Sequence, residues 1–362
     1  MKTEYKQTFP ICFVSKTSLL MFKKEMFITC NIDNGEITDQ IELNTTILNK
    51  IITRIPFLAR ILRKGVRCGI KVSDNLFLFT IGQTIYELDT SNASISEGFR
   101  TEDQSRPLTF SKIEGISGFD DGIYFGGYRG NPDKNPISIY RRLGTDHWEE
   151  VYRFPKNTIE HIHNIVADPF KNVVYILTGD FEASAGIWKA ENGFKTIKPI
   201  LNGAQTYRAC VAFPTPDGLV YATDSPFSNN SIRILKECGN SWESMQLMDI
   251  NGPSIYGCQW GGDFLFSTSV EGDGRNQSIW YKLFGHQRGS GIKENYSFIY
   301  KGNLDIGFSE FYKVKKDILP FHLFQFGTLI FANGLNESSV LPVFHISTQF
   351  HGMNTVLFEK RG

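Results

Sequence analysis

Short apolar runs rich in aromatic residues recur along the chain, and each is bounded by Gly, Asp or Asn. Their central aromatic residues are 45 to 51 residues apart, except for a last step of 65 residues. Runs with this composition predict β-strands, and their flanking residues predict turns. The central residues are Phe77, Tyr124, Tyr175, Tyr221, Phe266 and Phe331.

A second series of short apolar segments follows four of these runs at nearly the same interval. Its members are Ser138–Arg141, Gly186–Lys189, Ser231–Ile234 and Ser278–Tyr281. Two series that share a period of about 46 residues predict a repeated unit of four strands, which is the size of a propeller blade.

We therefore expect an all-β chain in which residues 1–362 form a single β-propeller domain. Six units fit between about residue 66 and residue 350, and strands between Phe13 and Ile41 supply a seventh. Strands from both ends of the chain would then close the ring and remove its exposed edges. Six blades, or a large β-sandwich, are the alternatives, but a sandwich gives no reason for a regular period.

Residues 46–64 break the strand pattern and predict an inserted helical segment. Apolar residues recur there at helical spacing, basic residues fill the other faces, and Pro56 predicts a kink or a restart. We expect this helix to pack between two blades, with contact to a membrane surface as the alternative. The apolar positions are Ile47, Leu48, Ile51, Ile52, Ile55, Leu58 and Leu62.

Composition narrows the function classes. The 38 basic and 38 acidic residues balance, so we expect no nucleic-acid partner. No run of 18 apolar residues predicts a transmembrane segment, and no apolar stretch near residue 1 predicts a secretory signal. The six cysteines form no CxxC pair, which is typical of buried thiols in a reducing compartment, so we expect a cytoplasmic protein.

The order of strands in a blade predicts where its chemistry lies. The start of the first strand and the loop after the second strand share one rim of the central channel, and channel mouths form concave ligand sites. His161 and His163 begin one such strand and are two residues apart, so they face the same side. Tyr207 and Arg208 occupy the matching position of the next blade.

Two sets of candidate residues follow. A neutral His can take a proton, and an Arg fork binds a carboxylate. No cofactor is expected, although His161 and His163 with Asp180 or His322 could instead hold a metal ion. The candidate catalytic residues are His161, His163, Tyr207, Arg208 and Asp180, and the candidate substrate-binding residues are Glu182, Arg129, Tyr128, Asp224, Tyr256 and Glu271.

Several segments resemble those of the sialidase-like, Asp-box (BNR-repeat) β-propeller proteins. They are His161–Pro169, Leu177–Asp180, Gly186–Lys189 and Tyr221–Ser225, together with eroded Asp boxes at Leu235–Trp242 and Ala190–Ile197. The resemblance implies a propeller and a carbohydrate-active protein, and the boxes are structural turns in that family. The set of His, Tyr and Arg looks more like that of propeller-fold polysaccharide lyases than that of sialidases.

The expected function is therefore a carbohydrate-active enzyme that cleaves an acidic oligosaccharide or polysaccharide at the channel mouth. Glycoside hydrolysis by a pair of carboxylates and elimination by a lyase both remain open. A propeller that binds a glycan or a protein without catalysis is the alternative, because fold does not fix function. Motifs of nucleotide-binding proteins, serine hydrolases and zinc proteases are missing from the sequence.

Overall fold

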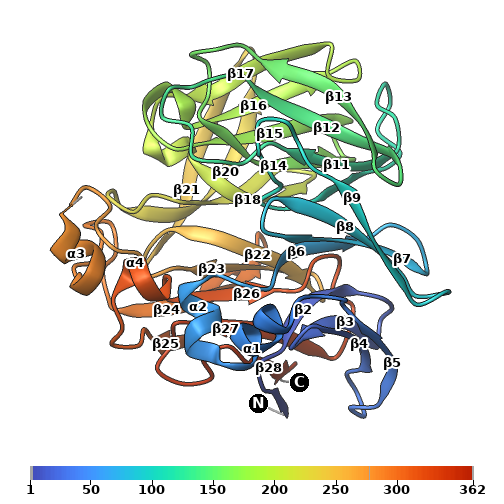
Figure 1. Ribbon diagram of the computed structural model, residues 1–362. Coiled ribbons are helices and arrows are strands. Elements are labelled where there is room, and N and C mark those ends of the chain that lie inside the picture. The colour runs from blue at the N-terminus through green and yellow to red at the C-terminus, as the bar shows by residue number, and fades with distance from the viewer. Residues whose placement is uncertain (1–2, 277, 361–362) are drawn as a thin grey trace.

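Seven four-stranded antiparallel sheets stand as blades around a central channel (Figure 1). The computed structural model describes residues 3–276 and 278–360. Blade 1 comprises β2 (Phe9–Phe13), β3 (Ser18–Lys23), β4 (Met26–Asn31) and β5 (Ile37–Glu42), and blade 2 comprises β6 (Val66–Lys71), β7 (Leu76–Ile81), β8 (Thr84–Asp89) and β9 (Ser94–Phe99). Blade 3 comprises β10 (Ser111–Ile113), β11 (Gly122–Gly126), β12 (Ile137–Gly144) and β13 (His147–Phe154). Blade 4 comprises β14 (His161–Asp168), β15 (Val173–Gly179), β16 (Gly186–Glu191) and β17 (Thr196–Asn202). Blades 5 to 7 comprise β18 (Ala209–Thr215), β19 (Gly218–Thr223), β20 (Asn230–Cys238) and β21 (Ser241–Ile250); β22 (Ser254–Trp260), β23 (Asp263–Thr268), β24 (Tyr296–Asn303) and β25 (Gly307–Lys315); and β26 (Thr328–Phe331), β27 (Val340–Ile346), β28 (Thr355–Glu359) and β1 (Thr3–Tyr5).

Blade 7 is built from both ends of the chain. β1 pairs antiparallel with β28, with Tyr5 opposite Thr355, and the N and C labels lie side by side in Figure 1. This pairing covers the outer edge of β28 and closes the ring. The seven-bladed propeller and its closure by strands from both ends are therefore confirmed.

Two details of the predicted repeat are wrong. Phe331 lies on β26, the innermost strand of its blade, rather than on a second strand. The last step is long because an inserted segment separates β23 from β24 in blade 6. The segment after Ser278 forms helix α3 (Ile279–Phe284) instead of a third strand, and β24 takes that place. The Ser278 side chain accepts a hydrogen bond from the Tyr281 backbone N–H, so this cap starts a helix where the repeat predicted a strand.

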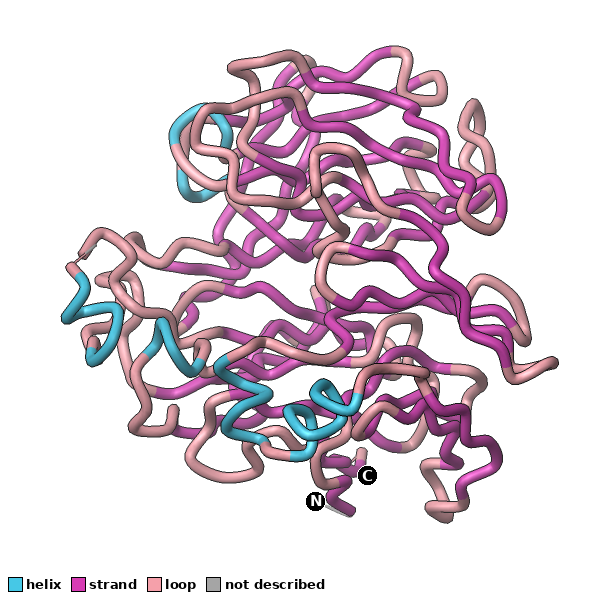
Figure 2. Tube along the Cα trace, viewed as in Figure 1, coloured by secondary structure: helices cyan, strands magenta, loops and turns pink. Residues whose placement is uncertain are grey.

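The helical insertion is broken at Pro56, as predicted. α1 (Ile47–Arg54) and α2 (Pro56–Ile61) are separated by Ile55, and Figure 2 shows them on the same side of the ring as α3 and α4 (Phe321–Phe324). In α2, Arg60 binds Asp317 at 2.8 Å and donates to the carbonyl of Phe324 at 2.7 Å. The insertion is thereby tied to the segment that precedes blade 7.

The outer face of α1 is apolar and open. Ile47, Leu48 and Ile51 are exposed, while Ile52 is buried. Among the helices of the described residues, none combines the length and the apolar character that crossing a bilayer requires.

Five of the seven innermost strands carry a β-bulge near the same rim of the channel. In β14 the register shifts between Ile162 and Asn164, and in β18 it shifts between Ala209 and Val211. The extra residues are therefore His163 and Cys210. Because a bulge redirects a side chain and often occurs beside a functional site, this rim is the expected place for a functional site. The other three bulges lie in β2, β6 and β22.

Candidate functional site

A compact polar cluster lies at the bulged rim, between blades 4 and 5. His161 and His163 come from the start of β14, and Arg208 directly precedes β18. Asp180 and Asp224 follow the second strands of the same two blades, β15 and β19. The shared rim that the sequence predicted thus brings five of the candidate residues together, and all of them except Asp180 are buried.

Hydrogen bonds to the backbone fix the tautomers of the two histidines. The Nδ1 atom of His161 is 3.0 Å from the carbonyl of Arg129, and that of His163 is 2.9 Å from the carbonyl of Ala209. A carbonyl only accepts, so each Nδ1 carries a proton. Each neutral ring therefore presents a bare Nε2 to the centre of the cluster.

Three electron-pair donors meet at that centre. The two Nε2 atoms are 3.0 Å apart, and each is 3.2 Å from Oδ1 of Asp180. Three acceptors at these distances repel unless a cation lies between them. Either one extra proton, which makes one ring an imidazolium, or a metal ion satisfies this requirement.

The donors fit a divalent metal ion. Ligands held at right angles by bonds of about 2.1 Å are about 3.0 Å apart, close to the separations seen here. Two His and one carboxylate are also a known ligand set for transition metals, and the Nδ1 hydrogen bonds supply the outer support that such ligands use. His161, His163 and Asp180 are thus the residues that would hold an ion.

Arg208 links the two carboxylates of the cluster. Its Nη2 atom is 3.0 Å from Asp180 Oδ1 and 3.2 Å from Asp224 Oδ2, and its guanidinium lies 5.3 Å from the ring centre of Phe181. Asp224 Oδ2 also accepts a hydrogen bond from the Cys210 thiol at 3.3 Å. The other oxygen of Asp224 is buried and has no partner within the described parts of the chain.

The surroundings of Asp180, Asp224 and Glu271 shift the pKa values of their carboxyl groups in different directions. Burial raises the pKa of Asp180, but the contacts with His161 and His163 and the charge of Arg208 outweigh it and hold this pKa well below its usual range. Burial raises the pKa of Asp224 in spite of Arg208. Burial and the negative charge of Asp224 raise the pKa of Glu271 to about 7. Near neutral pH, Asp180 is an anion and Glu271 is partly protonated, a division typical of acid–base pairs.

Tyr128 is the phenol that lies against the histidines. Its ring centre is 4.5 Å from that of His161 and 6.1 Å from that of His163. Burial and the negative charge of Asp180 raise its pKa well above the usual range, so its hydroxyl keeps its proton. Gly179 leaves room for the cluster, because a Cβ there would lie 2.2 Å from Cε1 of His163.

Five of the predicted residues lie apart from the cluster or contribute in another way. Tyr207 lies in the short helix η2 (Gln205–Tyr207) and makes no hydrogen bond or ring contact with the histidines among the described residues. Glu182 is exposed and lies 3.8 Å from Lys134. Arg129 offers its carbonyl to His161 and pairs its side chain with Asp103. Tyr256 lies on β22 of the neighbouring blade 6 and lines a cavity that Cys210 also lines, and His322, the alternative metal ligand, lies on α4 instead of opening a blade.

The sequence interpretation missed Cys210 and Arg106. Cys210 is two residues after Arg208, the spacing that singled out His161 and His163, so the same alternation could have found it. Arg106 lies 5.5 Å from the ring centre of Tyr128 and continues the cluster towards blade 3. It precedes the first strand of that blade by five residues, in a loop with no pattern to mark it.

Glu271→Gln is expected to change how stability depends on pH. The folded protein holds a proton on Glu271 up to about pH 7, whereas the unfolded chain releases it near pH 4. The free energy of unfolding therefore falls as the pH rises from about 4 to 7, and the Gln variant lacks that contribution. Urea unfolding at pH 5 and pH 8 should show that the variant gains stability relative to wild type at pH 8. An equal difference at both pH values would contradict the raised pKa.

No family model and no curated protein matches the chain. Solved propeller structures do resemble it over nearly its whole length. Oligogalacturonate lyase from Vibrio parahaemolyticus aligns with 98% of this chain and 89% of its own, at a TM-score of 0.57 and 10% identity. An oligogalacturonate lyase in complex with manganese aligns with 99% of this chain and 90% of its own, at a TM-score of 0.51 and 11% identity. The Cps50 (Swd1) β-propeller domain from Myceliophteria thermophila aligns with 100% of this chain and 98% of its own, at a TM-score of 0.55 and 6% identity.

Identities this low show the fold alone, and the relatives include both lyases and a propeller described only by its fold. The Asp-box resemblance remains an expectation. Its two eroded boxes do lie at the turns between the third and fourth strands, at β20–β21 and β16–β17. What the comparisons show is that this chain has the architecture of a β-propeller.

Proposed function

We propose that the protein is a carbohydrate-active enzyme that cleaves an acidic glycan by elimination at the channel mouth. The observation that carries this proposal is the meeting of the His161 and His163 Nε2 atoms beside Asp180 and Arg208, next to a phenol that stays protonated. A base, a cationic group and a proton donor are the three parts that such a reaction needs.

The steps follow from the chemistry of uronic acids. A neutral His161 or His163 takes the proton from the carbon next to the sugar carboxylate, and the bond from the neighbouring carbon to the leaving oxygen breaks. The leaving oxygen receives a proton from Tyr128 or from Glu271. The products are a sugar with a carbon–carbon double bond conjugated to its carboxylate and a glycan with a new hydroxyl end, so atoms and electrons balance without a co-reactant.

Elimination is favoured over hydrolysis by the state of the carboxylates. Asp180 and Asp224 both contact Arg208, and a carboxylate held by an Arg is a weak nucleophile. In the proton-bound form of the His pair, by contrast, one of the two Nε2 atoms keeps its electron pair. The His pair is only 4% and 3% exposed, so a substrate reaches it beside Asp180, whose side chain is 24% exposed.

A divalent ion held by His161, His163 and Asp180 would replace the shared proton. Its chemistry there would be to neutralise the sugar carboxylate, as Arg208 does in the proton-bound form. The base would then be a different residue, so the two forms make opposite predictions for a chelator.

The test is turnover of a panel of polyuronates and sialylated glycans by wild type, with and without a chelator. Absorbance of the conjugated double bond reports elimination, and new reducing ends without absorbance report hydrolysis. Elimination that persists with the chelator supports the proposal. Loss of activity that Mn²⁺ restores would overturn the assignment of the base, and hydrolysis would overturn the reaction type. Saturable binding of a glycan with no product would identify a binding protein instead.

A further inference from the structure

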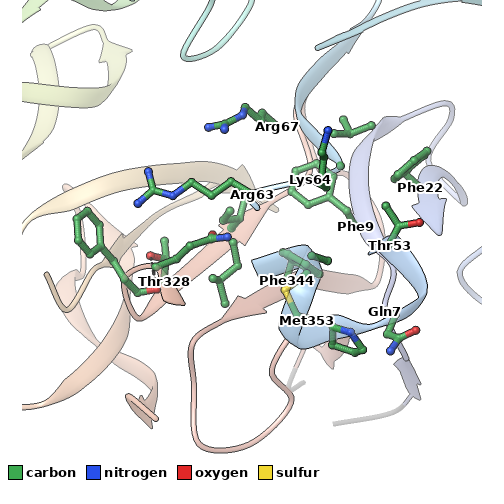
Figure 3. A pocket seen from close by; sticks show the side chains of 18 of the residues that line it. Gln7, Phe9, Phe22, Thr53, Arg63, Lys64, Arg67, Thr328, Phe344 and Met353 are labelled. Atoms are coloured by element: carbon green, nitrogen blue, oxygen red, sulfur yellow. Dashed lines mark hydrogen bonds between the residues drawn. The ribbon is translucent and has the colours of Figure 1, made fainter. Parts of the chain in front are cut away.

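A second cavity lies at the same mouth, on the side of blades 1, 2 and 7. It has a volume of about 250 Å³ and runs beneath α2, between the first strands β2, β6 and β26 (Figure 3). A smaller cavity of about 100 Å³ shares Phe9, Arg67, Leu108, Tyr256 and Ile330 with it and continues down the channel. The larger cavity is called the α2 pocket below.

The α2 pocket is strongly cationic. Among its lining residues are five basic side chains and no Asp or Glu. None of the five is within 4.0 Å of a carboxylate in residues 3–276 and 278–360. The buried Glu25 feels the charge of Lys64, but burial raises the pKa of its carboxyl group. The five side chains are Lys24, Arg63, Lys64, Arg67 and Arg106.

Arg67 is a basic side chain of the α2 pocket with unused hydrogen-bonding capacity. Its Nε atom is buried and has no hydrogen-bond partner in the described chain. Burial, followed by the positive charges of Arg106 and Arg63, lowers the pKa of Arg67. Like charges gathered in a half-buried site destabilise one another, and a bound anion removes that cost by pairing with the guanidinium groups.

Most of the remaining lining of the α2 pocket is apolar, and its uncharged polar side chains include Gln7, Thr53, Gln325 and Thr328. In Figure 3, Arg63, Lys64 and Arg67 occupy the upper side of the pocket, and Phe344 and Met353 lie below them. Phe9, Leu108, Ile330 and Ile346 also contribute to the lining. A sugar ring carries hydroxyl groups on every side, and a mostly apolar lining offers them few partners. A ligand with an apolar body and one anionic head satisfies both parts.

We propose that the α2 pocket binds an amphiphilic organic anion, with a carboxylate or phosphate head against Arg67, Arg63 and Lys64 and an apolar body against Phe344 and Met353. This site is separate from the His cluster and does not depend on the function proposed for that cluster. Arg106 borders both sites, because its guanidinium lies over Tyr128, whose ring contacts His161.

The test is calorimetric titration of the full chain with octyl phosphate and octanoate below their critical micelle concentrations. Inorganic phosphate, octanol and octyltrimethylammonium are the matched probes that lack the tail, the charge or its sign. We expect saturable binding of at least one octyl anion, at least tenfold tighter than that of octanol or phosphate, and no binding of the octyl cation. Arg67→Gln should weaken it by about 10- to 100-fold, because a charged hydrogen bond is lost. Arg153→Gln, at an exposed ion pair on blade 3, should leave it unchanged.

Two outcomes would overturn the proposal. One is the absence of saturable binding by either octyl anion in a protein that unfolds cooperatively. The other is binding that octanol matches or that Arg67→Gln leaves intact. If an acidic oligosaccharide binds through Arg67 while the octyl anions do not, the α2 pocket is a subsite for the glycan, and the amphiphile assignment is wrong. If the wild-type protein binds an octyl anion but cleaves no glycan, the result counts only against the function proposed for the His cluster.

Discussion

Arg208→Met lowers the free energy of unfolding by about 3–5 kcal/mol at pH 7, the loss expected when one partner of a buried ionic cluster is removed. Arg208 is buried and contacts Asp180 and Asp224 at 3.0 and 3.2 Å. Without it, two carboxylates remain in a poorly solvated site with no permanent cation. Met keeps the length of the side chain and its contact with Phe181, so the loss reports the charge rather than a cavity.

Urea unfolding measures this change, and two further variants test its cause. Arg153→Met removes an exposed Arg that pairs with Glu150, and we expect a loss below about 1 kcal/mol. Adding Asp224→Asn to Arg208→Met should restore part of the stability, because one of the stranded charges is removed. A loss below 1 kcal/mol in Arg208→Met would mean that the cluster is not held by this charge.

His163→Gln is expected to lower kcat/KM for the cleaved glycan by about 10²- to 10⁴-fold, the usual contribution of a positioned acid or base. His163 is the extra residue of the β14 bulge, and its Nε2 is 3.0 Å from that of His161. Gln can still donate to the carbonyl of Ala209, but its amide has no basic nitrogen to accept a proton. Initial rates on the substrate that wild type cleaves measure the effect.

His322→Gln is the control for this experiment, because His322 lies on α4 outside the cluster. It should leave kcat/KM within about twofold of wild type. Urea midpoints of both variants separate a loss of chemistry from a loss of folding. If His163→Gln folds and retains its rate, the His pair is part of the scaffold and the proposed mechanism is wrong.

The repeat of the sequence was sufficient to predict the architecture. An interval near 46 residues in two series of apolar segments allows few folds, because each four-stranded unit must bury its faces against neighbours. The same interval misled at Ser278, where it predicted a strand. The helix cap at Ser278 and the contacts of the inserted segment determine the structure there, and neither of them follows the repeat.

The candidate site was predictable as far as topology reached. Residues at the start of a first strand and after a second strand had to share a rim, and His161, His163, Asp180 and Arg208 do meet there. Tyr207 was placed by the same spacing, but η2 sets it apart from the histidines, and Tyr128 from the preceding blade takes the position beside them. Sequence spacing gives the height of a residue along the channel, whereas the direction of a loop side chain depends on its own turn.

By itself, then, the sequence determined the class of fold, the number of blades and the rim that carries the polar residues, because these follow from a period and from strand order. Only the tertiary structure decided the rest. The bulges that redirect His163 and Cys210 come from strand pairing within a blade. The tautomers set by the carbonyls of Arg129 and Ala209 and the convergence of Arg63, Arg67 and Arg106 come from contacts between blades. Such contacts join residues far apart in the chain, so the pattern along one strand does not predict them.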